Sequence, residues 1–309
     1  MSPAPSQPMP RYQVTHRTAY THGSFVTAAW QSLHLQPRNE AAQHCESFEL
    51  LVAPHPADLA SRFDYFGNKQ HVFTLQEPHR ELTITSRSIV RREEPALPMA
   101  GLTPTFGEIP RLVEEAVMDE DFTLEQYLHP SPLVPLLPAA RALAGELAGD
   151  LDPATSVMDW LSIFGERFNR AFVFDRGATL VSTPLADVIA ERKGVCQDFA
   201  HLLISCLRQN GLPAAYVSGY LLTKPPSGRP RLVGADASHA WVSCFVPGTG
   251  WVDFDPTNAC FVGAGHIVVA RGRDFFDVSP VKGLFSGGGE HLLETGVTVE
   301  EAEWAGRTE

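Results

Sequence analysis

The hydrophobic pattern of the 309-residue chain changes its period along the sequence, and this change restricts the folds that the chain can adopt. Over residues 11–92 apolar and polar residues alternate, which is the two-residue period of β-strands. From residue 112 apolar residues recur every three or four positions, which is the period of helices, and strand-like runs return after residue 213. Strands, then helices, then antiparallel strands predict an α+β fold and not a doubly wound parallel sheet.

The first part of the chain predicts an antiparallel, β-sandwich-like domain over residues 1–100. Residues 1–10 are rich in Pro and Ser and are expected to form a loose tail, whereas residues 93–110 have the Pro and Gly content of a linker. Gly67-Asn68 is typical of a turn between two strands. The strands of this domain are expected around residues 12–17, 48–52, 64–74 and 82–86.

The rest of the chain divides into a linker and helical segment, residues 101–150, and a core with a C-terminal strand, residues 151–309. Thr183-Pro184 is a helix start signal, and Asn210-Gly211 is a helix end signal. Helices are expected around residues 112–117, 137–147, 157–164, 184–193 and 196–209. Strands are expected around residues 215–222, 239–246, 251–255 and 293–299.

Composition excludes several classes of function. The 36 acidic residues exceed the 24 Lys and Arg residues, so the formal net charge is −12, which argues against nucleic acid or an anionic membrane as a partner. No signal peptide and no apolar stretch of membrane-spanning length is evident, so we expect a soluble, cytoplasmic protein. The five cysteines are widely spread and do not resemble a disulfide framework, which directs attention to a reactive thiol.

Cys196 is the cysteine whose position favours chemistry. It lies in the first turn of the helix expected at 196–209, where unpaired backbone N–H groups and the helix dipole stabilise a thiolate. The same N–H groups can stabilise the oxyanion that forms when a thiolate attacks an acyl carbon. Cys206 lies in the apolar stripe of this helix and is interpreted as a structural residue.

A thiolate nucleophile needs a base, and the base needs an orienting partner. His239 stands at the start of a predicted strand, and the next predicted strand carries Asp253 and Asp255 on one face. Either aspartate can hold the far ring nitrogen of the histidine, as in a catalytic triad, and the strand periodicity does not choose between them.

Three sequence motifs together resemble those of the bacterial transglutaminase-like family, which belongs to the papain-like cysteine-enzyme superfamily. They are Gly-Val-Cys-Gln-Asp-Phe-Ala-His at residues 194–201, Ser-His-Ala-Trp-Val at 238–242 and Trp-Val-Asp-Phe-Asp-Pro-Thr at 251–257. The resemblance covers nearly the whole chain, because the β-rich front resembles the amino-terminal domain of these proteins. The run at 265–283 resembles the segment that follows their core.

The resemblance implies a papain/transglutaminase-like core in which Cys196 is the nucleophile, His239 the base and Asp255 the orienting acid. Asp253 becomes the weaker candidate. The implied activity is acyl transfer on a protein or peptide amide through a thioester, and transamidation is the favoured reaction. Hydrolysis of peptide or isopeptide bonds by a cysteine peptidase or amidase is the alternative, and a non-catalytic interaction scaffold is a third.

Three further residues are weaker candidates for substrate binding. Trp241, on the same strand face as His239, is expected to line the acyl pocket, and Tyr220 precedes the long loop at 223–238 and can contribute to a groove. Asp198 matches a family motif position, but a carboxylate in the first turn of a helix more often caps that helix.

The sequence predicts neither a metal nor another cofactor. Zinc sites usually use closely spaced Cys and His pairs, and the one adjacent pair, His44-Cys45, points to opposite faces of a strand. No phosphate-binding glycine motif supports a nucleotide cofactor.

Overall fold

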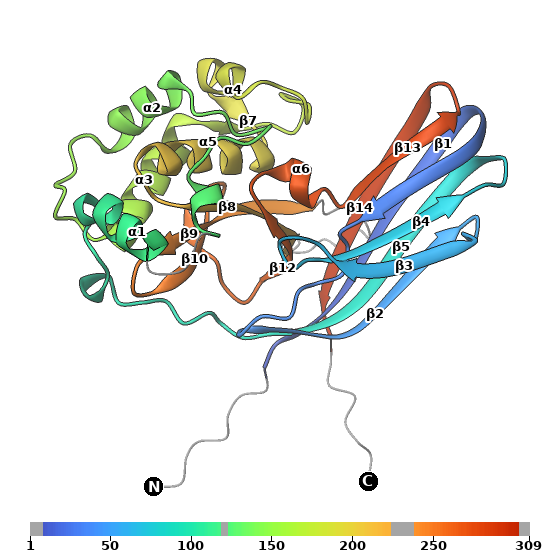
Figure 1. Cartoon of the computed structure of the whole chain (residues 1–309), viewed down its shortest axis with the longest axis horizontal. Helices are drawn as coiled ribbons and strands as arrows, with labels where there is room; N and C mark the ends of the chain where they lie inside the picture. Colours follow the sequence, from blue (N-terminus) through green and yellow to red (C-terminus); the bar gives the residue numbers. More distant parts are fainter. Residues whose placement is uncertain (1–8, 119–122, 224–237, 303–309) are drawn as a thin grey trace, which may run out of the picture.

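The computed structural model describes residues 9–118, 123–223 and 238–302, and these form two parts that lie beside each other (Figure 1). The first part, the β domain, is a curled antiparallel sheet. The second part, the core, combines helices with another antiparallel sheet. Together they confirm the predicted α+β class. The strands of the first sheet are β1 (Arg11–Leu33), β2 (Gln43–Ala53), β3 (Asp58–Phe63), β4 (Lys69–Leu75), β5 (His79–Arg92), β13 (Val281–Gly287) and β14 (His291–Glu301).

The 23-residue strand β1 organises the first sheet because its two halves have different partners. The first half, from Arg11 to His22, pairs with β5 and β14, and the second half, from Val26 to Leu33, pairs with β4 and β13. The register is irregular between the two halves. The sheet thereby curls around one apolar cluster to which β1, β4 and β5 all contribute, and it encloses its core without a separate second sheet.

The predicted C-terminal strand exists, but it does not belong where the sequence analysis placed it. Residues 293–299 lie within β14, which pairs with β1 from His22↔His291 to Tyr12↔Glu301. The strand therefore completes the first sheet and is not part of the core sheet. Alternation of apolar residues identifies a strand but carries no information about its partner, especially one nearly 300 positions away.

The core contains every helix and strand that the sequence predicted between residues 112 and 255. Its five-stranded sheet has the order β11-β10-β9-β8-β12, and α5 packs against β8 and β9. Its helices are α1 (Ile109–Met118), α2 (Pro138–Ala148), α3 (Val157–Ala171), α4 (Leu185–Glu191), α5 (Cys196–Gln209) and α6 (Phe275–Val278), with 3₁₀ turns at Ala100–Leu102, Phe106–Glu108 and Glu125–Tyr127. Its strands are β8 (Ala214–Leu221), β9 (His239–Val246), β10 (Gly250–Asp255), β11 (Cys260–Phe261) and β12 (His266–Gly272), and the short strands β6 (Val173–Phe174) and β7 (Lys193–Gly194) pair separately.

Helix α5 is buried on all sides and is the centre of the core. The predicted apolar stripe is confirmed, with Phe199, Cys206 and their apolar neighbours at most 2% exposed. The opposite face is buried as well, and backbone carbonyls of neighbouring segments accept hydrogen bonds from its polar side chains. The Ser205 hydroxyl donates to the Pro135 carbonyl at 2.7 Å, and the Arg208 guanidinium donates to the Ala214 carbonyl at 2.8 Å. A helix held in this way places its first residue, Cys196, with little freedom.

Most of the expected loop at 223–238 and most of the expected tail at 1–10 lie outside the described residues. Within the described ranges, no helix is long and apolar enough to cross a membrane.

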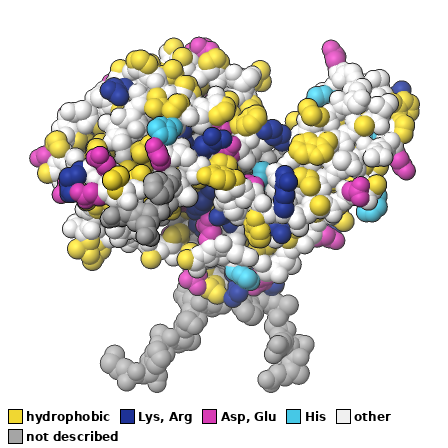
Figure 2. All heavy atoms as spheres, viewed as in Figure 1, with side chains coloured by type: hydrophobic (Ala, Val, Ile, Leu, Met, Phe, Trp, Pro, Cys, Tyr) yellow, Lys and Arg dark blue, Asp and Glu magenta, His cyan; other side chains and the backbone are white. Residues whose placement is uncertain are grey.

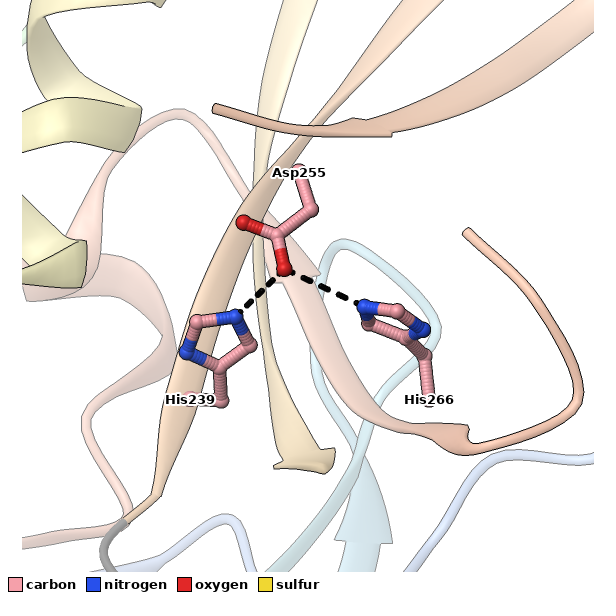
Figure 3. A group of neighbouring side chains, drawn as sticks. All are labelled: His239, Asp255 and His266. Carbon is pink, nitrogen blue, oxygen red and sulfur yellow. Dashed lines mark hydrogen bonds and ion pairs between the residues drawn. The ribbon is translucent and has the colours of Figure 1, made fainter. Parts of the chain in front are cut away.

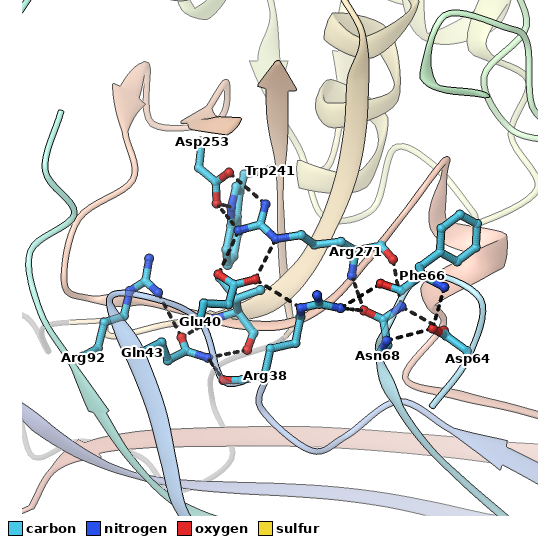
Figure 4. Close-up of polar contacts among 11 residues, drawn as sticks. Arg38, Glu40, Gln43, Asp64, Phe66, Asn68, Arg92, Trp241, Asp253 and Arg271 are labelled. Atoms are coloured by element: carbon cyan, nitrogen blue, oxygen red, sulfur yellow. Dashed lines mark hydrogen bonds and ion pairs between the residues drawn. The ribbon is translucent and has the colours of Figure 1, made fainter. Parts of the chain in front are cut away.

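The two parts of the molecule meet in a network of largely buried polar groups centred on Arg271 of β12, whose side chain is 20% exposed (Figure 4). Its guanidinium donates to Glu40 of the first part at 2.8 and 3.0 Å and to Asp253 of β10 at 2.9 and 3.0 Å. Burial raises the pKa of both carboxyls, but the Arg271 charge outweighs burial and lowers them. One guanidinium therefore bridges two carboxylates from different parts of the chain.

Side-chain amides of the first part also cover the free edge of β12, which pairs with β8 on its other side. Gln43 accepts from the Val268 N–H and donates to the Val268 carbonyl, both at 2.8 Å. Asn68 does the same with the Arg271 N–H and carbonyl, again at 2.8 Å. Two buried amides thus take the place of a neighbouring strand and satisfy backbone groups that a buried sheet edge would leave unpaired.

The Arg271 bridge predicts a large effect of substitution on stability. Arg271→Met leaves Asp253 without its cation and Glu40 with Arg38 as its remaining ion-pair partner, so we expect the free energy of unfolding to fall by about 3 kcal/mol. Denaturant titration measures this. Arg170→Met is the matched control, because Arg170 forms an exposed pair with Glu166 and its loss should change stability by less than about 0.5 kcal/mol. Similar losses in both variants would contradict a central role for Arg271.

Candidate active site

Cys196 is the first residue of α5 and is half-buried. Val195, just before it, is extended, and its N–H donates to the Asp198 carboxylate at 2.8 Å. The Thr179 hydroxyl donates to the same oxygen at 2.6 Å. A Cβ on Gly194 would lie 2.9 Å from Asp198, so only glycine fits there without displacement. The contacts of Asp198 are those of a residue that fixes the helix start, and burial raises its pKa.

His239 lies between Cys196 and Asp255. Its Nε2 is 2.7 Å from Asp255 Oδ2 (Figure 3), and its ring also interacts with the Cys196 side chain. Burial lowers the pKa of His239, but the interactions with Asp255 and Cys196 outweigh burial and raise the pKa to about 10. The raised pKa favours a protonated His239 imidazole at neutral pH, held beside the sulfur of Cys196.

Asp255 is fully buried and accepts hydrogen bonds on both oxygens. Oδ1 accepts from the N–H groups of Thr257 and Asn258 at 2.9 and 3.2 Å. Oδ2 accepts from Asn258 Nδ2 at 2.6 Å and from the ring of a second histidine, His266, at 3.2 Å, in addition to His239. Burial raises the pKa of Asp255, but these donors hold it well below its usual range. Asp255 is thus both a turn-forming residue and the partner of His239.

The structure separates the two aspartates that strand periodicity could not distinguish. Asp253 binds Arg271 through both oxygens and also accepts from Trp241 Nε1 at 3.2 Å, so its oxygens are occupied away from His239. Of the two aspartates, Asp255 is the one that is hydrogen-bonded to His239.

The structure places Trp241 beside His239 but not in an open pocket. Its side chain is 0% exposed, and its ring lies 6.1 Å from that of His239, centroid to centroid. Tyr220 is also buried, and its hydroxyl shares a 2.9 Å hydrogen bond with Nδ1 of His16 in the first part. The structure therefore brings Cys196, His239 and Asp255 together, places Trp241 next to them, and directs Tyr220 to the first part.

Sequence reasoning did not single out His266. It lies in the run that resembles the segment after the family core. As one histidine among 12, it carried no distinguishing pattern in the sequence. It begins β12, a strand that the periodicity did not predict, and it reaches Asp255 from the side opposite His239 (Figure 3).

His239, Asp255 and His266 offer ligand atoms within 4.8 Å of one another, which raises the question of a metal. The Gly263 N–H lies 3.3 Å from His266 Nδ1, so Nδ1 is an acceptor and Nε2 carries the proton that points at Asp255. A metal-binding histidine has the reverse arrangement, with its second nitrogen donating to an outer partner. These surroundings suit a hydrogen-bond donor better than a metal ligand.

A separate cavity of about 630 Å³ lies at the boundary between the two parts. Its lining includes Arg38, Tyr127, Trp251 and Arg271, but neither Cys196 nor His239. Figure 2 shows Lys and Arg side chains gathered along this boundary. The cavity is therefore distinct from the site formed by Cys196, His239 and Asp255.

Comparison with known proteins agrees with the architecture. Residues 12–91 match the bacterial transglutaminase-like N-terminal region, and residues 139–256 match the transglutaminase-like superfamily. An uncharacterized protein of Mycobacterium tuberculosis is 41% identical over 282 residues, covering 89% of this chain and 87% of that protein. A protein-glutamine gamma-glutamyltransferase of Pseudomonas aeruginosa is 34% identical over 125 residues, or 39% of this chain and 18% of that protein.

A crystal structure from Cytophaga hutchinsonii, described as a candidate cysteine protease, has the same fold. It superposes with a TM-score of 0.70 at 18% identity, covering 97% of this chain and 93% of that one. Fold and sequence together define a transglutaminase-like core joined to an antiparallel β domain. The chain belongs to the bacterial transglutaminase-like family.

The cysteines predict a selective labelling experiment. Burial raises the pKa of Cys45 and of Cys260 to about 11, so these half-buried thiols are protonated at pH 6. Cys196, paired with His239, should react with iodoacetamide at pH 6 about tenfold faster than either of them. Peptide mapping by mass spectrometry measures the rates. His239→Ala should remove the preference, and equal labelling of all three cysteines would argue against the pair.

The raised pKa of His239 also predicts how stability depends on pH. His239 binds its proton with a pKa of about 10 in the folded protein and 6.5 in the unfolded chain. The stabilisation is therefore fully present below about pH 6.5 and is lost as the pH rises through about 10. The difference in free energy of unfolding between wild type and His239→Gln should be larger at pH 6 than at pH 10. An equal difference at both pH values would mean that His239 holds no extra proton.

Proposed function

We propose that this protein catalyses thiol-dependent acyl transfer on amide groups of proteins or peptides. The observation that carries the proposal is the position of His239, which is hydrogen-bonded to buried Asp255 and also interacts with the Cys196 side chain. A nucleophile, a base and an orienting acid in this order are the elements of a triad.

The chemistry proceeds in two steps. The Cys196 sulfur attacks the amide carbonyl, and the N–H groups at the start of α5 are available to the oxyanion. His239 gives its proton to the leaving amine as the C–N bond breaks, so a thioester remains on Cys196. A second nucleophile then attacks the thioester, His239 takes its proton, and the thiolate leaves with the acyl group transferred.

Transamidation is the first choice for the second step. The Pseudomonas aeruginosa relative, similar over 125 residues, bears the name protein-glutamine gamma-glutamyltransferase, and this supports an amine acceptor and a glutamine donor here. Water as the acceptor would give a peptidase or amidase with the same residues, since the acceptor depends on water exclusion and channel shape. A protein without either activity would be an interaction scaffold.

An amine-incorporation assay distinguishes transamidation, hydrolysis and a non-catalytic scaffold. Purified protein is incubated with a fluorescent primary amine and a panel of glutamine peptides, and both labelled peptide and cleaved or deamidated peptide are measured by mass spectrometry. We expect amine incorporation that falls more than about a thousandfold in Cys196→Ala. Cys45→Ala, on β2 of the first sheet, is the matched control and should retain full activity.

Each other outcome has a definite meaning. Cleavage or deamidation without amine incorporation, lost in Cys196→Ala, assigns hydrolysis in place of transfer. Equal product levels from wild type and Cys196→Ala would contradict the hypothesis that this protein is an enzyme.

A further inference from the structure

Asp255 is held by two histidines and not by one. His239 reaches Oδ2 from β9 at 2.7 Å, and His266 reaches the same oxygen from the start of β12 at 3.2 Å (Figure 3). His266 is 7% exposed and Asp255 is 0% exposed, so water does not compete for this contact. The proposed two-step chemistry uses Cys196, His239 and Asp255, and it leaves His266 without an assigned role.

The backbone determines which nitrogen of His266 carries the proton. The Gly263 N–H donates to Nδ1 at 3.3 Å, which requires a lone pair there, and the proton therefore lies on Nε2. Nε2–H faces an ionised carboxylate, and a hydrogen bond to a charged acceptor is stronger than one between neutral groups. The Trp241 ring meets the His266 ring edge to face, at 5.4 Å between centroids and an interplanar angle of 80°, and limits its rotation.

We propose that His266 is a positioning residue of this active site, a fixed donor that holds the Asp255 carboxylate against His239. This proposal rests on the proposed acyl-transfer function. With donors from His239, His266 and Asn258 on Oδ2, the carboxylate has one orientation, and it remains an anion while His239 keeps its proton for the leaving amine.

The first part of the chain sets the place of His266. Val268, two residues along β12, is bonded through both backbone groups to the Gln43 side chain, and Arg271 is bonded in the same way to Asn68. The β domain therefore supports the strand from which the second histidine reaches the carboxylate. In this role the β domain acts on the chemistry through β12.

Two substitutions at His266 separate positioning from stability. His266→Leu removes the donor, and His266→Gln retains an amide N–H at a similar reach. We expect His266→Leu to lower kcat for amine incorporation by between about tenfold and a hundredfold, and His266→Gln to restore it to within about threefold of wild type. The alkylation rate of Cys196 at pH 6, which needs no substrate, should follow the same order.

A matched variant controls for loss of packing. Ile267→Ala is on the same strand with its side chain in the helical core, on the face opposite His266, so it should lower the unfolding midpoint with little change in alkylation rate. His266→Leu with the wild-type rate, or His266→Gln as slow as His266→Leu, would overturn the positioning role.

Nitrogen NMR of the Cys196→Ala protein tests the proton assignment without any turnover. Histidine ¹⁵N shifts report which ring nitrogen is protonated, and we expect Nε2–H with unprotonated Nδ1 for His266, assigned by its absence in His266→Gln. A proton on Nδ1 would overturn the proposal. If wild type shows no amide chemistry but the NMR and alkylation results hold, the proposed function fails while His266 still positions Asp255.

Discussion

The bridge from Arg271 to Glu40 and Asp253 is the interaction on which the arrangement of this molecule depends. Removing two carboxylates and a guanidinium from water is unfavourable, and only close, bidentate geometry offsets that cost. The bridge therefore permits one relative placement of the two parts and resists others. Because Asp253 lies on β10 two residues before Asp255, the same bridge fixes the strand that carries the aspartate bonded to His239.

The bridge also explains why one face of β10 carries two aspartates with different tasks. Asp253 binds a permanent cation, so its charge is neutralised and its oxygens are occupied. Asp255, at the end of the strand, meets only neutral or titratable donors from side chains and the backbone, and it keeps a net charge to share with His239. Two carboxylates with different roles in the structure can thus stand two residues apart and differ only in their partners.

The sequence predicted the fold class, most helices and strands of the core, and the three residues Cys196, His239 and Asp255 that the structure brings together, because these follow from local signals. Helix starts, two-residue alternation and short motifs are properties of neighbouring residues. The choice between Asp253 and Asp255 was not decidable from periodicity, since it depends on Arg271, which is distant in sequence. His266 and the partner of residues 293–299 were inaccessible for the same reason, because each is defined by a contact between remote segments.

Strand β1 has a consequence for the order in which the molecule can be completed. It is made early, yet two of its partners, β13 and β14, are made after everything else in the described chain. During synthesis the core around α5 can condense while β1 still exposes unpaired edges on the side that these strands will cover. The β domain closes only after residues 281–301 have left the ribosome. Its contacts with β12 are complete only then. We therefore expect the thiol to gain its full reactivity as a late event in the life of a nascent chain.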